Sequence, residues 1–184
     1  MITPTLLETE ICETILAAVE KLYAARQTSN TAWTRRMKED LGHLGYSLGF
    51  TTCAAGFNGT FERGWLYDLV WYEEDSQGFL LSVPLVVESE WLEKFSEIKF
   101  DFEKLLAARV THRLMICQCR TRYKGERLQY FRDAVKVYRH RQPGDRYLIA
   151  LWDVVQEAFH FELIVLTDLN AVESTPIPIS KKVT

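Results

Sequence analysis

Two apolar segments that carry carboxylates restrict the fold of this chain more than any other feature. Residues 65–72 read WLYDLVWY, and residues 79–90 read FLLSVPLVVESE. Neither face of the first segment is polar, and a strand of that kind is normally central in a sheet that helices cover on both sides. Asp68 interrupts the first segment, and Glu88 and Glu90 end the second. A buried carboxylate without a partner costs several kcal/mol, so the three acids predict a bound cation, which we interpret as a metal ion.

The acids can meet only if the two strands pair in a suitable register. A tight turn centred at 76–77 would place Asp68 opposite Leu85, which leaves Glu88 roughly 10 Å further along and facing the other way. One β-bulge in the second strand corrects the facing. We expect it at Pro84, because proline lies in strands mainly at bulges and edges.

The rest of the chain alternates helical and strand patterns. Helices are expected where apolar residues recur every three or four positions, and strands where short apolar runs lie between turn residues. The expected order is helices at 5–26 and 33–47, strands at 48–55, 65–72 and 79–90, a helix at 100–110 with Asp101 as its N-cap, a strand at 112–118, a helix at 125–139, and strands at 147–152 and 159–166. That order predicts an α/β fold with a mixed central sheet and helices on both faces.

A length of 184 residues suits a single domain, 1–184. We expect an N-terminal helix and a polar break at 5–32, a core at 33–118, and a helix with two strands at 119–167. The tail at 168–184 is rich in Ser, Thr, Pro and Lys, which predicts disorder.

The order of the acids resembles the motif of the PD-(D/E)XK nuclease superfamily, which has the restriction-endonuclease-like fold. Asp68 on one strand is followed by a hairpin, by Glu88 and Glu90 at the end of the next strand, and by a helix with Lys104 in DFEKLL. The likeness covers roughly residues 35–118. It implies an αβββαβ core, which a C-terminal αββ extension would follow here.

Two residues depart from the motif of this superfamily. Tyr67 stands where the name of the family has proline, and Glu90 stands at the position of the motif lysine. Some members are similar in supplying the lysine from the following helix, so Lys104 is the substitute. On an ideal helical wheel Lys104 points about 200° away from Phe102, which is an obstacle to its reaching the acids, and Lys99 is the second choice.

The resemblance implies a Mg²⁺-dependent phosphodiester hydrolase, an endonuclease-like enzyme acting on DNA. Mg²⁺ or Mn²⁺ prefers carboxylate and water ligands, so Asp68 and Glu88 would bind the ion. Glu90 would be a further ligand or a base that orients the water, and Lys104 would stabilise the developing negative charge. Further supporting residues are Glu39, Lys99 and Gln118. Small nucleases of this type often act as dimers, so a homodimer is compatible with the resemblance.

The charge of the chain gives mixed indications about nucleic acid. The net charge is −3, but residues 120–146 hold nine Lys or Arg against three acids, a local net charge of +6. A basic segment beside an acidic metal centre suits a nuclease, and a solvated helix face explains the segment equally well. The candidate contacts with nucleic acid are Trp33, Arg35, Arg36, Arg132, Lys136 and Arg139.

We expect a cytoplasmic protein that does not enter a membrane. The N-terminus lacks the basic and apolar regions of a signal peptide, and no apolar run approaches the roughly 18 residues that span a bilayer. Cys12, Cys53, Cys117 and Cys119 show no zinc-binding C-x2-C spacing and read as small buried side chains in a reducing compartment.

A different class of function remains open from the sequence. Asp68 could bind a backbone end, and Glu88 and Glu90 could lie beyond the strand in water. The chain would then be a catalytically inactive nuclease fold that serves as a nucleic-acid-binding or protein-interaction module. Lys104 separates the two hypotheses, because the enzyme requires its amine to approach the carboxylates.

Overall fold

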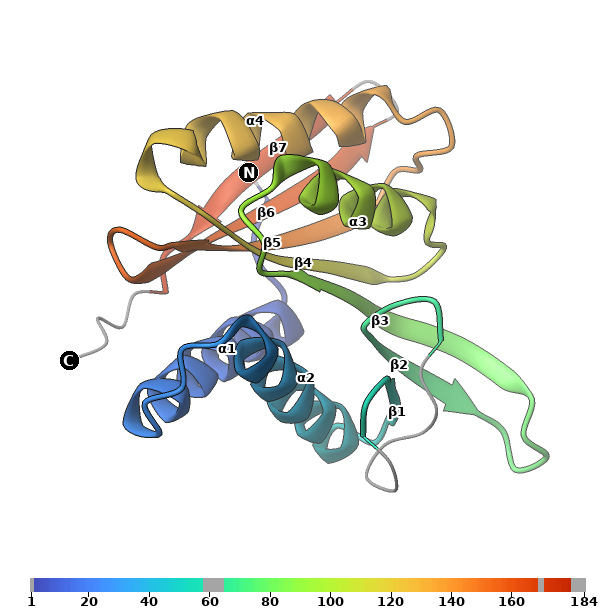
Figure 1. Cartoon of the computed structure of the whole chain (residues 1–184). Coiled ribbons are helices and arrows are strands. Elements are labelled where there is room, and N and C mark those ends of the chain that lie inside the picture. Colours follow the sequence, from blue (N-terminus) through green and yellow to red (C-terminus); the bar gives the residue numbers. More distant parts are fainter. Residues whose placement is uncertain (1, 58–64, 169–170, 180–184) are drawn as a thin grey trace.

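A seven-stranded mixed sheet forms the centre of the molecule, and its strands lie in the order in which they occur in the chain (Figure 1). The structure is a computed structural model that describes residues 2–57, 65–168 and 171–179. In these residues the helices are α1 (Leu6–Ala24), α2 (Asn30–Ser47), α3 (Phe95–Ala107) and α4 (Thr121–Val137). The strands are β1 (Thr51–Ala54), β2 (Leu69–Glu74), β3 (Leu80–Glu90), β4 (His112–Cys119), β5 (Arg146–Asp153), β6 (Ala158–Asp168) and β7 (Ala171–Ile177).

Helices cover both faces of this sheet, as the sequence predicts. Alternate residues of β2 to β6 pack with α1 and α2 on one face and with α3 and α4 on the other (Figure 1). Strands β3, β4 and β5 run parallel, joined through α3 and α4, and the other neighbouring pairs are antiparallel. A mixed sheet of this kind places the β2–β3 hairpin next to the parallel part.

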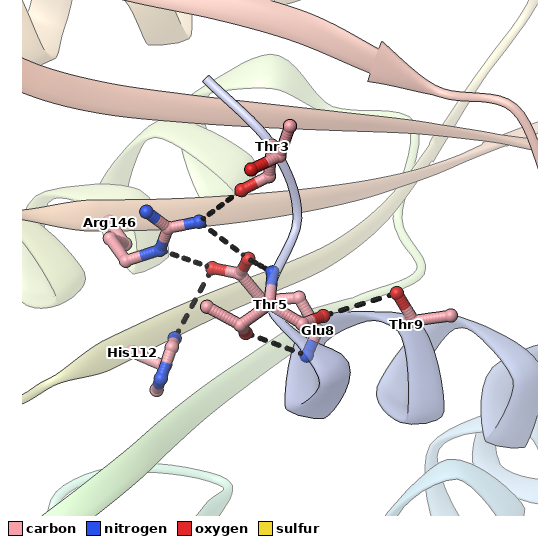
Figure 2. A network of polar contacts seen from close by, with 6 residues as sticks. All are labelled: Thr3, Thr5, Glu8, Thr9, His112 and Arg146. Carbon is pink, nitrogen blue, oxygen red and sulfur yellow. Dashed lines mark hydrogen bonds and ion pairs between the residues drawn. The ribbon is translucent and has the colours of Figure 1, made fainter.

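A buried ionic network ties the start of α1 to the first residues of β4 and β5 (Figure 2). Thr5 and Glu8 form a capping box at the helix N-terminus. The carboxylate of Glu8 accepts hydrogen bonds at 2.7 Å from both Nε and Nη2 of Arg146, and Nδ1 of His112 lies 3.3 Å from its Oε1. Burial raises the pKa of Glu8, but these hydrogen bonds together outweigh burial and lower that pKa to about 2.

Helix α3 begins at Phe95, five residues before the predicted start at 100, so the prediction of Asp101 as its N-cap is wrong. Ile98 continues the apolar stripe of Phe102 and Leu105 towards the N-terminus, and Glu97 in the first turn suits the helix dipole. The residue before the helix, Lys94, makes no side-chain cap hydrogen bond. Asp101 therefore lies within the helix.

The prediction of a disordered tail is wrong for residues 171–177, which form β7. This strand pairs with β6 at the edge of the sheet, where most of its residues are exposed. An edge strand tolerates polar residues and proline such as Pro176, so its composition resembled that of a loop. Residues 169–170 and 180–184 lie outside the described part of the chain.

Helix α4 also begins four residues earlier than predicted, at Thr121. Strand β2 begins at Leu69 rather than at residue 65, so Asp68 lies just before this strand and not within it. Of the helices that the structure describes, none has the length and apolar character that crossing a membrane requires.

Candidate metal centre

The pairing of β2 with β3 brings Asp68 level with Glu88. Leu69 pairs with Val87 at the end of the ladder, and Asp68, just before β2, accepts a hydrogen bond from the backbone N–H of Ser89, the residue after Glu88. Trp71 pairs with Leu85, but Glu73 pairs with Ser82, and two residues of β3 therefore oppose one residue of β2. Those two residues are 83 and 84, which confirms the predicted bulge at Pro84. A further register shift follows towards the turn, and the predicted pairing of Asp68 with Leu85 is wrong by three residues.

Asp68 has two partners that hold its carboxylate in one orientation. Its Oδ2 accepts a hydrogen bond from the backbone N–H of Ser89 at 2.9 Å. Nζ of Lys38, on α2, lies 2.9 Å from Oδ1, and the side chain of Lys38 is 11% exposed. The sequence suggested the neighbouring Glu39 as a supporting residue of the site and did not identify Lys38. The available signal was helical spacing, because Lys38 directly follows Met37 in the stripe of Trp33 and Leu41 that α2 buries.

Glu88 projects from β3 towards the α3 side of the sheet and is only 2% exposed. Alternation places it on the same face as Val86, which belongs to the core beneath α3 and α4. Nζ of Lys104 lies 2.7 Å from Oε1 of Glu88 and 2.9 Å from Oδ1 of Asp101. The obstacle expected from the helical wheel does not arise, because α3 packs against β3 and the long lysine stem reaches Glu88.

The pKa of Glu88 is raised from 4.5 to about 8. Burial is the largest cause, since a buried carboxylate loses the hydration that favours its charged form. Lys104 offsets part of this effect, while the negative charges of Asp68 and Asp101 raise the pKa further. Glu88 is thus a buried acid with less positive charge around it than its ionised form requires.

Glu90 does not join the other two acids. Its Oε1 accepts a hydrogen bond from the backbone N–H of Leu92 at 2.6 Å. In the part of the chain that the structure describes, no group of three or more His, Cys, Asp or Glu side chains could hold a metal ion. The predicted set of three carboxylates around one ion is therefore not formed, because Glu90 turns towards the loop that follows β3.

The supporting residues proposed from the sequence lie apart from Asp68 and Glu88. Glu39 pairs with Arg36 at 3.2 Å on α2. Lys99 pairs with Glu103 at 3.7 Å on an exposed side of α3. The side-chain amide of Gln118 donates to the backbone carbonyl of Trp91.

Two carboxylates of the predicted set remain, Asp68 and Glu88. Asp68 and Glu88 lie close enough for the charge of Asp68 to raise the pKa of Glu88. Mg²⁺ is usually held by one or two carboxylates and keeps several water or phosphate ligands, so a site for it would need both carboxylates to reach the same ion. Carboxylate donors also suit Mn²⁺. The positive charge that such an ion would supply is now provided by Lys104 beside Glu88 and Lys38 beside Asp68.

A cavity of about 480 Å³ on the α2 side of the sheet is lined by Lys38 and Ser89, the two residues that hold the carboxylate of Asp68. Its lining includes Lys38, Ser89 and Glu90, together with Arg35 and Trp91. A second cavity, of about 440 Å³, shares Trp91 with the first and is lined by further aromatic rings. Asp68 is not among the described residues that line the first cavity, but a substrate bound there would contact its two partners, Lys38 and Ser89.

Among the predicted contacts with nucleic acid, only Arg35 lines the cavity beside Asp68. Trp33 is 8% exposed and packs its ring against Trp91 and Trp152 at centroid distances of 4.9 and 5.0 Å, so it is mainly a core residue. Arg36 pairs with Asp40 at 3.2 Å.

The predicted contacts on α4 lie away from the acids. Arg132 binds both carboxylate oxygens of Glu162 at 2.6 and 2.7 Å, while Lys136 and Arg139 are exposed. Helix α4 packs against β5, β6 and β7, whereas the acids lie at β2 and β3. Helix α4, which forms most of the basic segment 120–146, therefore lies away from the acids, and of the two explanations of this segment its placement favours the solvated helix face.

No protein-family model matches this chain, and no curated protein and no solved structure shows significant similarity to it.

Proposed function

We propose that this chain is a Mg²⁺-dependent phosphodiester hydrolase of the PD-(D/E)XK type that acts on DNA. The observation that carries the proposal is the buried Glu88, level with Asp68 and 2.7 Å from the amine of Lys104. A carboxylate that burial makes costly to ionise is retained at functional sites, where a cation or a reaction uses it. The sequence hypothesis required this approach of Lys104 to the acids, and the distance supports it.

Each side chain has a distinct role in the proposed reaction. Asp68 and Glu88 would hold a divalent ion, which supplies charge neutralisation at the phosphate and lowers the pKa of a bound water. Lys104 would donate hydrogen bonds to the negative charge that develops on the phosphate oxygens. Asp101 holds the ammonium of Lys104 at 2.9 Å and thereby positions it. Glu90 lines the adjoining cavity, where it could orient a water molecule.

The cellular setting that we propose is the cytoplasm. None of the four cysteines, all within the described residues, forms a disulfide, and all four are buried, which is common for proteins of a reducing compartment.

The direct test is cleavage of supercoiled plasmid DNA with Mg²⁺ by the wild-type chain and by Asp68→Ala, Glu88→Gln and Lys104→Met. We expect the two acid variants to lose cleavage by at least about 10³-fold, since each removes a ligand of the ion. Lys104→Met should lose about 10²- to 10³-fold in rate, because it removes stabilisation of the transition state, and should still bind Mg²⁺, because both proposed ligands of the ion remain.

Lys99→Met is the matched control for Lys104→Met, as it removes a lysine from the same helix whose ion-pair partner among the described residues is Glu103. It should cleave like the wild-type chain. Retained cleavage by Asp68→Ala or Glu88→Gln would remove the assignment of the metal ligands.

A catalytically inactive nuclease fold, serving as a nucleic-acid-binding or protein-interaction module, is the second candidate. One observation favours it, namely that Lys38 and Lys104 already pair with Asp68 and Glu88 without any metal. Calorimetry separates the two candidates. Heat of binding with Mg²⁺ or Mn²⁺ that disappears in Asp68→Ala supports the enzyme, and its absence from the wild-type chain supports the module.

A further inference from the structure

The cavity beside Asp68 has the charge and the position of a site for an anion. Two cationic side chains, Lys38 and Arg35, line its 480 Å³, and Glu90 is the acid that faces them. The guanidinium carbon of Arg35 lies 5.9 Å from the centre of the Phe57 ring, within the range of a cation–π contact. Such a contact restrains the guanidinium, and no hydrogen bond of its N–H donors occurs within the described part of the chain. The cavity therefore offers two donors of positive charge next to the proposed metal ligand.

We infer that this cavity binds a backbone phosphate of the substrate strand, and that Lys38 exchanges its ion pair with Asp68 for that phosphate when the metal binds. The inference rests on the proposed function and deepens it. It assigns Lys38 and Arg35 to substrate binding, and it makes Lys38 a competitor of the metal ion.

The geometry around Asp68 makes Lys38 the group that moves. Oδ2 of Asp68 is fixed by the backbone N–H of Ser89 at 2.9 Å, so the carboxylate keeps its orientation. Lys38 lies 2.9 Å from Oδ1, at the end of a flexible four-carbon stem that lines the cavity. Its side chain is 11% exposed, so in the free protein Asp68 is its near partner. A rotation about the stem is enough to direct the ammonium from Asp68 into the cavity.

Competition between the two cations follows from this arrangement. The ammonium of Lys38 and a divalent ion both need Oδ1 of Asp68, and they repel each other when they are close. Lys38 therefore weakens metal binding while the cavity is empty. A phosphate in the cavity gives the ammonium another anion, so metal and substrate strengthen each other's binding reciprocally. Lys104 does not compete for Asp68 in this way, because its partners among the described residues are Glu88 and Asp101.

Two measurements on the full chain test the inference. The first is calorimetric titration with Mg²⁺ alone, without DNA. Lys38→Met should bind Mg²⁺ about threefold to tenfold more tightly than the wild-type chain, because it removes one neighbouring positive charge. Arg35→Met, which lacks contact with Asp68 among the described interactions, should leave this affinity unchanged.

The second measurement is binding of a 20-base-pair DNA duplex in Ca²⁺ as a function of salt. Lys38→Met and Arg35→Met should each bind DNA more weakly, and each should reduce the slope of log affinity against log salt by about one, as the loss of one phosphate contact predicts. Lys38→Arg keeps the charge and should keep the slope. Lys99→Met, whose ammonium pairs with Glu103, should change neither quantity.

The outcomes distinguish this inference from the proposed function. If the wild-type chain binds Mg²⁺ and cleaves DNA while Lys38→Met changes neither the metal affinity nor the salt slope, the inference is overturned and the function stands. If the wild-type chain binds no divalent ion, both fall. Thermal melting verifies that each variant is folded, and Lys38→Gln replaces Lys38→Met if methionine prevents folding.

Discussion

Two buried glutamates of this molecule, Glu8 and Glu88, have nearly the same exposure and opposite ionisation behaviour. Glu8 is 1% exposed and Glu88 is 2% exposed, and each has a cationic nitrogen at 2.7 Å. The pKa of Glu8 is lowered to about 2, whereas the pKa of Glu88 is raised to about 8. Burial is the largest single effect on both and raises both. Burial alone therefore does not tell a structural acid from a functional one.

The difference lies in what surrounds the two carboxylates. Glu8 accepts hydrogen bonds on both oxygens, from the fork of Arg146 and from the backbone N–H of Thr5 (Figure 2). Glu88 has the ammonium of Lys104 on Oε1 and the negative charges of Asp68 and Asp101 nearby. The first acid is fully compensated and stabilises the fold. The second is only partly compensated, so an additional cation such as the proposed metal ion would stabilise its ionised form.

The largest effect on the free energy of unfolding is expected when Glu8 is replaced. Glu8→Ala should lower the free energy of unfolding by about 3 kcal/mol, because it leaves Arg146 and His112 without their buried acceptor and removes the capping box of α1. Urea unfolding followed by circular dichroism at pH 7 measures it. Glu13→Ala, an exposed glutamate on the same helix, should change stability by less than about 0.5 kcal/mol. A loss below about 1 kcal/mol for Glu8→Ala would show that the network is not stabilising.

The sequence predicts one part of this contrast, the capping box, but not the ion-pair partners. The capping box of Thr5 and Glu8 is local, because the two residues lie three positions apart in the chain, and this spacing predicts it. The partner that lowers the pKa of Glu8 is Arg146, which is 138 residues away in the chain and becomes its neighbour only when the sheet forms. Local sequence patterns cannot predict a pair of residues that lie so far apart in the chain. The same limit applies to Lys38, because its partner Asp68 lies on a different element.

The fold class and the bulge at Pro84 were predictable, because hydrophobic periodicity and proline chemistry act locally. The boundaries of the elements were less predictable, as the early start of α3 at Phe95 shows. The edge strand β7 was not predicted, because its polar residues are compatible with a loop. Glu88 was identified since an acid at the end of an apolar strand conflicts with burial. Glu90 turns away from the other two acids because its carboxylate binds the backbone N–H of Leu92, and the sequence does not predict this contact.

A smaller effect, of opposite sign, is expected for Glu88. In the metal-free protein at pH 8.5, Glu88→Gln should raise the free energy of unfolding by about 1–3 kcal/mol, because it removes an acid that is costly to ionise where it is buried. Urea unfolding in the presence of a chelator measures it. A variant less stable than the wild-type chain at this pH would show that Lys104 compensates Glu88 fully.

The pH dependence of stability gives the sign of the contributions of Glu88 and Glu8 separately. The pKa of Glu88 is raised, so the folded state keeps its proton longer, and the contribution of Glu88 to stability falls as pH rises from 4.5 to about 8. The pKa of Glu8 is lowered, so its contribution is present above 4.5 and is lost as pH falls towards 2. The stability difference between wild type and each variant should therefore change in different pH windows.

The smallest effect is expected at Asp101, which touches Lys104 and not the proposed ion. Asp101→Asn removes a negative charge that raises the pKa of Glu88, so this pKa should fall by less than about one unit, and the pH at which Mg²⁺ binding is half-maximal should fall with it. Cleavage at saturating DNA should slow about threefold to fivefold, because Lys104 loses one of its two anchors. Calorimetry and cleavage across pH 6 to 9 measure both quantities, with Glu103→Gln, on the exposed side of α3, as the control. An unchanged pH profile would mean that Asp101 acts on Lys104 alone, and that Glu88 owes its high pKa to burial and Asp68.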